Sequence, residues 1–331
     1  MINKRLFEHY GIDTNKDLKI ESRCARPYDT VLIDKQGSCY ACECQSWLPQ
    51  SIGNLQIKSL QDIISSDTHK RLQGSITDGT YRYCNEHRCS WLTGNDLGYF
   101  SKAVPSTNLK HIRLAIDESC NLRCPSCRKG MIFHKQGSAY NLGIRLADKV
   151  NDWLDKHQYP VQVHIGSDGD PFASHVYRHF MANTPRKDNI RYSILTNGLM
   201  LRDFHGNVPH IISRTSKLGI SIDGATEYTY ERLRLGGKWN KILDGLEHAK
   251  SLKAEHGFKF ELHMVVQKDN WREMEQMLEL GHRHNVDRIY FNRIEDWNTK
   301  LDMSAQTFFE DSEFKEKVQR VRADPIAFMN L

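Results

Sequence analysis

From about residue 108 onward, strand-like and helix-like segments alternate along the chain, and this alternation most restricts the possible fold. Six apolar segments rich in β-branched residues are predicted strands: 111–117, 161–166, 190–196, 218–223, 258–266 and 288–293. Helical patterns lie between several of them, at 143–157, 238–252 and 271–284. Strands that alternate with helices form a parallel sheet with right-handed crossovers. We therefore expect an α/β fold, a partial (β/α)6 barrel that resembles an incomplete TIM barrel.

The chain before about residue 105 has a different character, because it is irregular and rich in cysteine. It contains a strand-like run at 28–34, a turn at 35–37 and a helix-like stretch at 59–74. We predict two domains: a small cysteine-rich domain over residues 1–105 and the partial barrel over residues 106–331.

Composition and charge exclude several classes of protein. No apolar run approaches the roughly 20 residues of a membrane span, and residues 1–13 lack the apolar stretch of a signal peptide. We therefore expect a cytoplasmic protein with no membrane partner. The formal net charge of +5 is small for 331 residues, and the cations are scattered among acidic residues. The charge pattern therefore does not indicate a nucleic-acid partner.

The nine cysteines all lie at or before Cys127. An odd number of cysteines in a long chain without an export signal does not fit a disulfide framework. Clustered thiols in a reducing compartment are better explained as metal ligands, because thiolate is a soft donor that suits zinc, copper(I) or iron–sulfur clusters.

The most specific motif follows the first predicted strand. Cys120, Cys124 and Cys127 have the spacing C-x3-C-x2-C in the loop after Asp117. In βα barrels, active sites are built from loops at the carboxyl ends of the strands. Three thiolates can bind three irons of a cubane and leave the fourth iron open to another ligand. The alternative is a zinc knuckle completed by a distant ligand such as His134.

This motif in this position resembles the radical S-adenosylmethionine (radical SAM) enzymes, and the likeness extends from about residue 110 to residue 297. The resemblance implies a site-differentiated 4Fe–4S cluster on these cysteines, whose open iron binds the methionine part of S-adenosylmethionine. In that family, an electron from the cluster cleaves the cofactor to a 5′-deoxyadenosyl radical, which abstracts hydrogen from a substrate. The resemblance also implies an electron donor that is similar to flavodoxin or ferredoxin.

The segment after the second strand resembles the Gly-Gly-Glu-Pro motif of the family, whose backbone holds the methionine amino group. Its candidate residues are Ser167, Asp168, Gly169, Asp170 and Pro171. Glycine suits a backbone that comes close to a ligand. The alternative is an ordinary tight Asp-Gly turn.

The ends of later strands also resemble cofactor-lining positions. The candidates are Asn197, Ser221, Asp223, Arg234, Gln267 and Asn270. Ser221 and Asp223 share one face of their strand and are expected at the ribose. Arg234 can bind the methionine carboxylate through two hydrogen bonds, unless it is a solvated arginine at a helix end. Ser126 stands where the family usually has an aromatic residue, so we expect an apolar residue of the fifth or sixth strand at the adenine.

The N-terminal cysteines form a second pattern. The spacing of Cys24, Gly37 and Cys42 resembles the start of SPASM and twitch domains, which bind auxiliary 4Fe–4S clusters but usually follow the barrel. The resemblance implies one auxiliary 4Fe–4S cluster, because six cysteines are too few for two cubanes with four protein ligands each. Its ligands are predicted to be Cys24, Cys42, Cys84 and Cys89, with Cys44 as the rival of Cys42 and Cys39 as a structural thiol. The alternative is a zinc site that includes His87.

These resemblances imply a radical SAM enzyme of an oxidoreductase or peptide-modifying class. A peptide or protein is the first expected substrate, and a small alcohol or sugar is the second. No catalytic acid or base can be named, because lone histidines on strands, such as His111, His164 and His263, are more often interior residues. A non-catalytic iron–sulfur redox sensor and a zinc-dependent nucleic-acid-binding module are the other classes considered.

Overall fold

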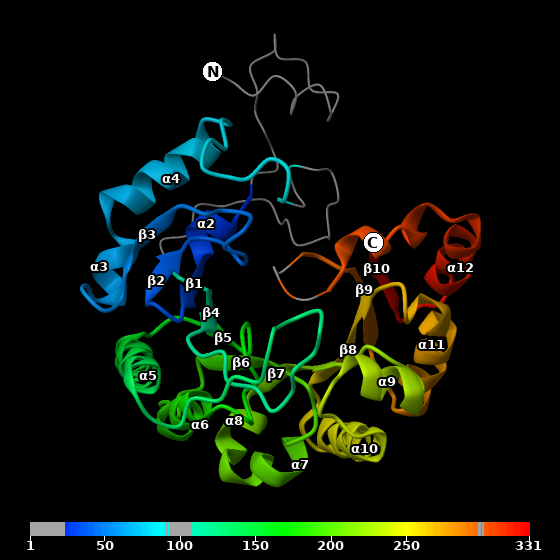
Figure 1. Ribbon diagram of the computed structural model, residues 1–331. Coiled ribbons are helices and arrows are strands. Elements are labelled where there is room, and N and C mark those ends of the chain that lie inside the picture. Colours follow the sequence, from blue (N-terminus) through cyan, green and yellow to red (C-terminus); the bar gives the residue numbers. More distant parts are fainter. Residues whose placement is uncertain (1–23, 90–91, 93–107, 297–298, 300) are drawn as a thin grey trace. The chain divides into compact units, whose positions relative to one another are not determined.

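The structure is a computed structural model that describes residues 24–89, 92, 108–296, 299 and 301–331. The chain divides into two compact units, coloured by sequence in Figure 1. The first unit combines the chain up to Ile116 with 141–164 and 183–190, and the second comprises 117–140, 165–182 and 191–331. The domain boundary expected near residue 105 lies outside the described residues and stays a prediction. None of the described helices has the length and apolar character needed to cross a membrane.

The first unit contains a mixed sheet to which the cysteine-rich segment contributes strands. Its members are β1 (Thr30–Asp34), β2 (Ser38–Tyr40), β3 (Ser51–Asn54), β4 (His111–Ala115) and most of β5 (Val161–Ile165). β1 pairs in parallel with β4, with Thr30 opposite His111, whereas β2 pairs antiparallel with both β1 and β3. All five residues of β1 are buried, as expected for a parallel strand covered on both faces. The expected strand at 28–34 is therefore found as β1, with a partner that the sequence did not indicate.

The helices of the first unit are α2 (Arg26–Asp29), α3 (Leu60–Ile64), α4 (Asp67–Thr77) and most of α5 (Ser138–Lys156). The prediction of a single helix over 59–74 was wrong, because α3 and α4 both occupy this stretch. Ser59 begins α3 by accepting a hydrogen bond from the Asp62 amide, and Ser66 begins α4 by accepting one from the His69 amide. A serine at this position stabilises a new helix start and competes with continuation of the preceding helix.

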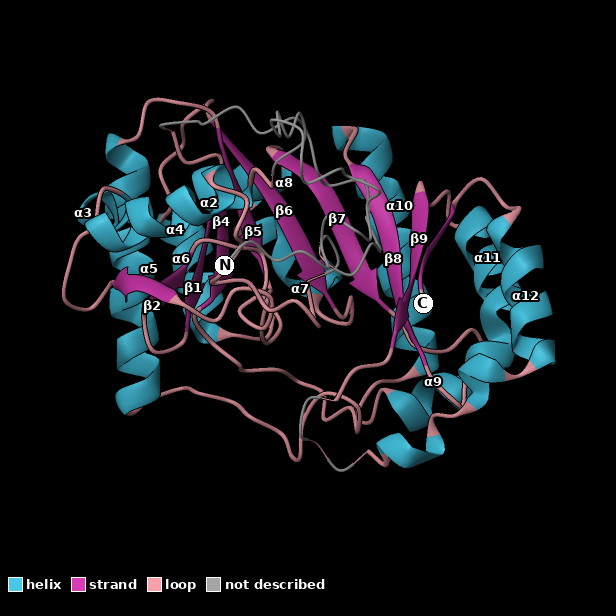
Figure 2. Cartoon of the chain, turned by 90° about the horizontal axis from the view of Figure 1, so that it is seen from above, coloured by secondary structure: helices cyan, strands magenta, loops and turns pink. Residues whose placement is uncertain are grey.

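The second unit is built on a parallel sheet in the order β6-β7-β8-β9-β10. The strands are β6 (Ile190–Thr196), β7 (Thr215–Ser221), β8 (Lys259–Val266), β9 (Arg288–Arg293) and β10 (Ala327–Asn330). Figure 2 shows β6 to β9 side by side, with helices between successive strands. In chain order, α6 (His175–Asn183) precedes β6, and α12 (Ser312–Arg322) follows β9. The helices between β6 and β9 are α7 (Leu201–Phe204), α8 (Pro209–Ile212), α9 (Glu227–Leu233), α10 (Trp239–His256) and α11 (Met274–Arg283).

Among the described strands, β3 of the first unit pairs only with β2, and β10 of the second unit pairs only with β9. The expected α/β class with an open, largely parallel sheet is confirmed. The expected strands 190–196 and 288–293 match β6 and β9 in both bounds, and the other four are found within a few residues. β10 and α12 were not predicted.

The two faces of β7 differ in character. Ile220 lies on the face that packs against α10, since Ile220 and Ile242 both contact the position of Gly198. Successive side chains of a strand point to opposite faces, so Lys217, Gly219 and Ser221 lie on the other face. The buried apolar residues of α10 cover the first face, and the helix ends at Gly257, whose φ of +73° suits a glycine C-cap.

Candidate cluster and cofactor site

The three cysteines of the C-x3-C-x2-C motif lie in the loop between β4 and α5, within the second unit. Cys120 and Cys124 are buried, whereas Cys127 is exposed. The Cys120 amide donates to the Ile132 carbonyl at 2.9 Å, and the Cys127 amide donates to the Cys124 carbonyl at 3.0 Å. These bonds fold the loop on itself, so three thiols come from one short and internally bonded segment.

Each of the three sulfur atoms faces an N–H group. The pairs are Cys120 with Leu122 N at 3.4 Å and Asn197 Nδ2 at 3.6 Å, Cys124 with Arg234 Nη1 at 4.0 Å, and Cys127 with Arg128 Nη2 at 3.6 Å. Two of these donors are guanidinium groups, whose positive charge favours thiolate over thiol. Thiolate is the form that binds metal, so the surroundings of all three cysteines suit metal ligation.

Burial opposes this effect at two of the cysteines. It raises the pKa of the Cys120 thiol to about 11, and the nearby Asp170 carboxylate raises it as well. Burial also raises the pKa of Cys124, although Arg234 acts in the opposite direction. Both groups are therefore thiols near neutral pH in the metal-free chain, and metal binding must release their protons.

The segment that resembles Gly-Gly-Glu-Pro packs against the cysteine loop. Gly166 has a φ of +95°, and a Cβ there would lie 2.1 Å from the Leu195 carbonyl oxygen. Gly169 has a φ of +68°, and a Cβ there would lie 2.7 Å from the carbonyl oxygens of Asp117 and Ser119. Only glycine fits at these two places, so the backbone of this turn lies directly on its neighbours.

The Asp170 carboxylate is used entirely within the protein. Its Oδ1 accepts from the amides of Phe172 and Ala173, and its Oδ2 accepts from Thr196 Oγ1 and the Asn197 amide. Asp170 therefore fixes the segment just before α6 to the end of β6. Of the other candidates in this segment, Ser167 is exposed, Asp168 is half-buried and Pro171 is buried beside Gly166.

The strand ends of β7 and β8 form a second polar group. One Asp223 oxygen lies 2.8 Å from Arg234 Nε, and the other accepts from the Val265 amide at 2.9 Å. Asn270 Nδ2 donates to the carbonyls of Asp223 and Val265 at 2.9 and 2.8 Å. Asp223 and Asn270 thus satisfy the backbone around them, which is a structural use of both side chains.

One buried donor at this end of β8 is left over. Gln267 Nε2 is buried and has no hydrogen-bond partner among the residues that the structure describes. A buried polar group without a partner is rare in a folded protein, and a bound ligand is one of its ordinary explanations. Ser221, half-buried at the end of β7, likewise makes no side-chain hydrogen bond in the described chain.

The structure thus brings several predicted site residues together in one unit. Contacts link the cysteine loop with Asn197, and Asn197 with Asp170, while Arg234 joins Cys124 to Asp223. Ser167 and Ser221 lie outside this contact network. The sequence reasoning missed Arg128, which also donates to the Glu118 carbonyl at 2.7 Å. The position of Arg128 directly after the third cysteine was the available signal, because a neighbouring cation stabilises the ionised form of a thiol.

The first unit contains a second group of cysteines, around a cavity. A small pocket, partly open to solvent, is lined by Cys24, Cys42, Cys84 and Cys89 together with Pro27, Trp47, Leu48, Tyr81 and Leu92. Burial raises the pKa of all three of Cys24, Cys42 and Cys84, that of Cys42 to about 12, and neighbouring cysteines raise them further. The four cysteines predicted as auxiliary ligands therefore lie close together.

Cys44, the predicted rival of Cys42, and Cys39, the predicted structural thiol, do not line this pocket. Cys39 is buried on β2, where its Sγ donates to the Gly37 carbonyl at 3.7 Å, and Cys44 Sγ lies 3.0 Å from Ser46 Oγ. The His87 side chain is 83% exposed and does not line the cavity.

The donor sets fit iron–sulfur clusters. Among the described residues, no three His, Cys, Asp or Glu side chains converge as they would around one metal ion. A cubane places each thiolate on a different iron, so its ligands need not converge on one point. Three thiols with N–H donors and four thiols around a cavity are both compatible with such clusters.

The sequence pattern of the radical SAM superfamily matches residues 116–281, which is half of the chain. The protein therefore belongs to the radical SAM superfamily. No curated protein matches its sequence.

Several solved structures resemble the chain. SuiB of Streptococcus suis bound to S-adenosylmethionine is 14% identical, with a TM-score of 0.41 over 64% of this chain and 44% of the SuiB chain. SuiB bound to its precursor peptide SuiA is 10% identical, with a TM-score of 0.49 over 93% and 73% of the two chains. anSMEcpe with bound AdoMet is 17% identical, with a TM-score of 0.37 over 57% and 52%. In the first of these matches the chain spans less than half of the SuiB chain.

Proposed function

We propose that this protein is an enzyme in which Cys120, Cys124 and Cys127 bind a 4Fe–4S cluster with one open iron that binds S-adenosylmethionine. The observation that supports this most strongly is the cysteine loop after β4, within the region matched by the superfamily, with an N–H group facing each sulfur. When bound, the cluster and cofactor supply a 5′-deoxyadenosyl radical that removes a hydrogen atom from a substrate.

The chain's own residues hold and orient these groups. Gly169 brings the backbone of the 166–171 turn next to the cysteine loop, and Gly166 brings it against β6, so the peptide groups of this turn are the ones we assign to the methionine amino group. Asp170 anchors that turn through its four hydrogen bonds. Asn197 and Arg128 donate toward the sulfur atoms and favour their ionised form.

Arg234 and Ser221 are the side chains that we assign to the methionine carboxylate and the ribose. Arg234 Nε is engaged by Asp223 and Nη1 faces the Cys124 sulfur, which leaves Nη2 as a donor for a carboxylate. Asp223 then acts by orienting Arg234, since both of its oxygens have partners. Asn270 donates to the backbone carbonyl of Asp223, and Gln267 supplies a further buried donor.

We assign one auxiliary 4Fe–4S cluster to Cys24, Cys42, Cys84 and Cys89. The pocket that these four cysteines line supports the assignment. Cys44 lies beside Ser46 and does not line the pocket, so we assign Cys42 rather than Cys44 as the ligand. A zinc ion bound by four thiolates is the competing occupant. An auxiliary cluster would pass an electron to or from the barrel site, or bind substrate.

A peptide or protein is the proposed substrate. The spacing of the N-terminal cysteines supports this, since it resembles SPASM and twitch domains, whose enzymes often modify peptides or proteins. A small alcohol or sugar is the second candidate. An electron donor that resembles flavodoxin or ferredoxin is the proposed redox partner.

Metal analysis of anaerobically prepared protein tests both cluster assignments. Two cubanes predict about eight irons and eight sulfides per chain. Replacement of Cys120, Cys124 and Cys127 by Ala is expected to leave about four irons, and so is replacement of Cys24, Cys42, Cys84 and Cys89. Cys44→Ala is the control and is expected to retain about eight. One zinc with four irons in the intact protein would overturn the auxiliary cluster alone, and absence of iron would overturn both assignments.

A further inference from the structure

A group of polar side chains surrounds Glu261 on one face of the second unit's sheet. Lys217 Nζ lies 3.1 Å from Glu261 Oε1, Tyr290 donates its hydroxyl to the same oxygen at 3.4 Å, and His263 Nε2 lies 3.7 Å from Oε2. The Glu261 side chain is 7% exposed, whereas those of Lys217 and His263 are 37% and 26% exposed. The carboxylate is thus buried, and its two basic neighbours are open to solvent.

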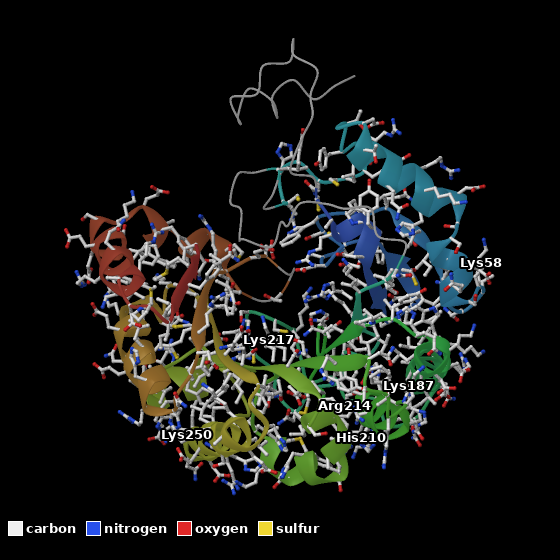
Figure 3. All side chains as sticks on the ribbon, turned by 180° about the vertical axis from the view of Figure 1, so that it is seen from behind. Lys58, Lys187, His210, Arg214, Lys217 and Lys250 are labelled. Carbon is white, nitrogen blue, oxygen red and sulfur yellow. The ribbon has the colours of Figure 1, made fainter. Side chains whose placement is uncertain are left out.

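Strand register places these residues on one face. β7 and β8 pair so that Gly219 lies opposite Glu261 and Ser221 lies opposite His263, and β9 adds Tyr290 opposite His263. This is the face of β7 that does not pack against α10. Figure 3 shows Lys217 and the α10 residue Lys250 on opposite sides of this sheet.

Gly219 makes room for the His263 ring. A Cβ on Gly219 would lie 2.9 Å from Leu195 Cδ1 and 3.0 Å from His263 Nε2. Glycine within a strand weakens it, and often marks a place where another group approaches closely. His263 stacks on Tyr290, with ring centres 4.7 Å apart and an angle of 11° between the rings. The imidazole is therefore packed between Gly219 and Tyr290, and it is more ordered than a solvent-exposed histidine.

The charges on this face are predominantly positive. Burial alone would raise the pKa of Glu261, but its contacts with His263 and Lys217 outweigh burial and lower it, so the group is a carboxylate. Arg288, opposite Glu261 in the register, lies over the rings of Phe328 and Tyr290 at 5.5 and 5.9 Å. One cation, an imidazole and a tyrosine hydroxyl thus contact the carboxylate, and a second cation lies on the neighbouring strand. An ammonium group has three N–H donors, so Lys217 keeps donors for a further acceptor.

On the basis of the proposed function, we propose that Lys217 and His263 form a substrate subsite that binds a carboxylate of a peptide substrate. Ser221, which we assign to the ribose, lies opposite His263 in the register. A carboxylate held here would therefore fix the substrate beside the cofactor. The carboxylate can belong to an acidic side chain or to a peptide C-terminus, and both are recognised by the same donors.

Three short peptides of equal length test this subsite with the intact, cluster-loaded protein. The first is acetyl-Ala-Gly-Glu-Gly-Ala amide, the second carries Gln in place of Glu, and the third is the Gln peptide with a free C-terminal carboxylate. Calorimetric titration under anaerobic conditions is expected to show about tenfold tighter binding of one or both carboxylate peptides than of the neutral amide. Tighter binding of the first peptide identifies an acidic side chain as the ligand, and tighter binding of the third identifies a peptide C-terminus.

Variants then localise the preference. Lys217→Gln is expected to reduce it at least fivefold, whereas Lys217→Arg keeps the charge and is expected to retain it. Lys250→Gln, on the opposite side of the sheet beside Glu247, is the matched control and is expected to change nothing. Equal binding of all three peptides to the unaltered protein overturns the subsite, whether or not any variant folds. A preference that survives Lys217→Gln also overturns it.

The subsite and the proposed function fail separately. The same preparation of unaltered protein is assayed for 5′-deoxyadenosine without peptide. Product formation without a carboxylate preference overturns the subsite alone. A carboxylate preference without any product overturns the radical chemistry and leaves a carboxylate-binding site in place.

Discussion

Arg234 Nε lies 2.8 Å from Asp223 Oδ2, with side chains that are 12% and 2% exposed. The other Asp223 oxygen accepts from the Val265 amide, and Arg234 Nη1 lies 4.0 Å from the sulfur of Cys124. This ion pair therefore joins the end of α9, the end of β7 and the cysteine loop. Both charges are largely buried, so each depends on the other for compensation.

Removal of one partner is expected to be costly. Arg234→Met leaves a buried, unpaired carboxylate, and such losses destabilise proteins by about 3–5 kcal/mol. Arg232→Met is the matched control two residues away, because Arg232 pairs with Asp269 at 3.5 Å where both side chains are about half exposed. Exposed pairs contribute about 1 kcal/mol or less. Urea unfolding measures both, and equal midpoints for the two variants would show that the buried pair adds no stability.

The glycine at the start of the Gly-Gly-Glu-Pro-like turn gives a second prediction. Gly166→Ala places a methyl group 2.1 Å from the Leu195 carbonyl oxygen, in addition to a φ of +95°. Gly137→Ala has a similar φ of +92° but no atom within 4 Å of the new methyl group. The control should lose only the backbone preference of about 1–2 kcal/mol, and Gly166→Ala should lose several times more or fail to fold. Thermal unfolding of both variants measures these losses of stability. Similar losses for the two variants would mean that the turn can move away from the Leu195 carbonyl.

Most of the alternating strands and helices could be predicted from the sequence, because buried parallel strands are apolar and rich in β-branched residues. Strands β6 and β9 were predicted in both bounds for this reason. The parallel pairing of β1 with β4 was not, since their partnership joins residues about 80 positions apart and leaves no local pattern. The helix break at Ser66 was missed because the apolar residues on both sides of it fit one helical face, although serine is favoured at the start of a helix.

The site shows the same division. Thiol spacing indicated the two groups of cysteines, since metal ligation imposes a spacing on the chain. The pairing of Asp223 with Arg234 left no such mark, and each residue was instead predicted to contact the cofactor. Those cofactor contacts stay predictions. The polar group around Glu261 was also missed, because His263 looks like a lone strand histidine until the register places Lys217 and Tyr290 beside it.

The Glu261 group predicts a pH dependence of stability. The folded state holds the pKa of Glu261 below its ordinary value of 4.5. A lowered carboxyl pKa stabilises the folded state above the unfolded pKa, and this stabilisation is lost as the pH falls through the folded value. Glu261→Gln should therefore be less stable than the unaltered protein near pH 7, and the difference should shrink below pH 4.5. Urea midpoints measured from pH 7 to pH 3 check this, and a difference that grows with acidity would contradict it.

The release of 5′-deoxyadenosine from S-adenosylmethionine tests the central claim most directly. With both clusters loaded, oxygen excluded and a strong reductant present, the protein should release 5′-deoxyadenosine and methionine slowly even without its substrate. Cys124→Ala should abolish this release, because it removes a proposed ligand of the reacting cluster. Cys39→Ala, a buried thiol that lines neither group of ligands, should retain it. If the loaded and reduced protein forms no 5′-deoxyadenosine, the proposed radical chemistry is wrong and an iron–sulfur redox sensor becomes the better account.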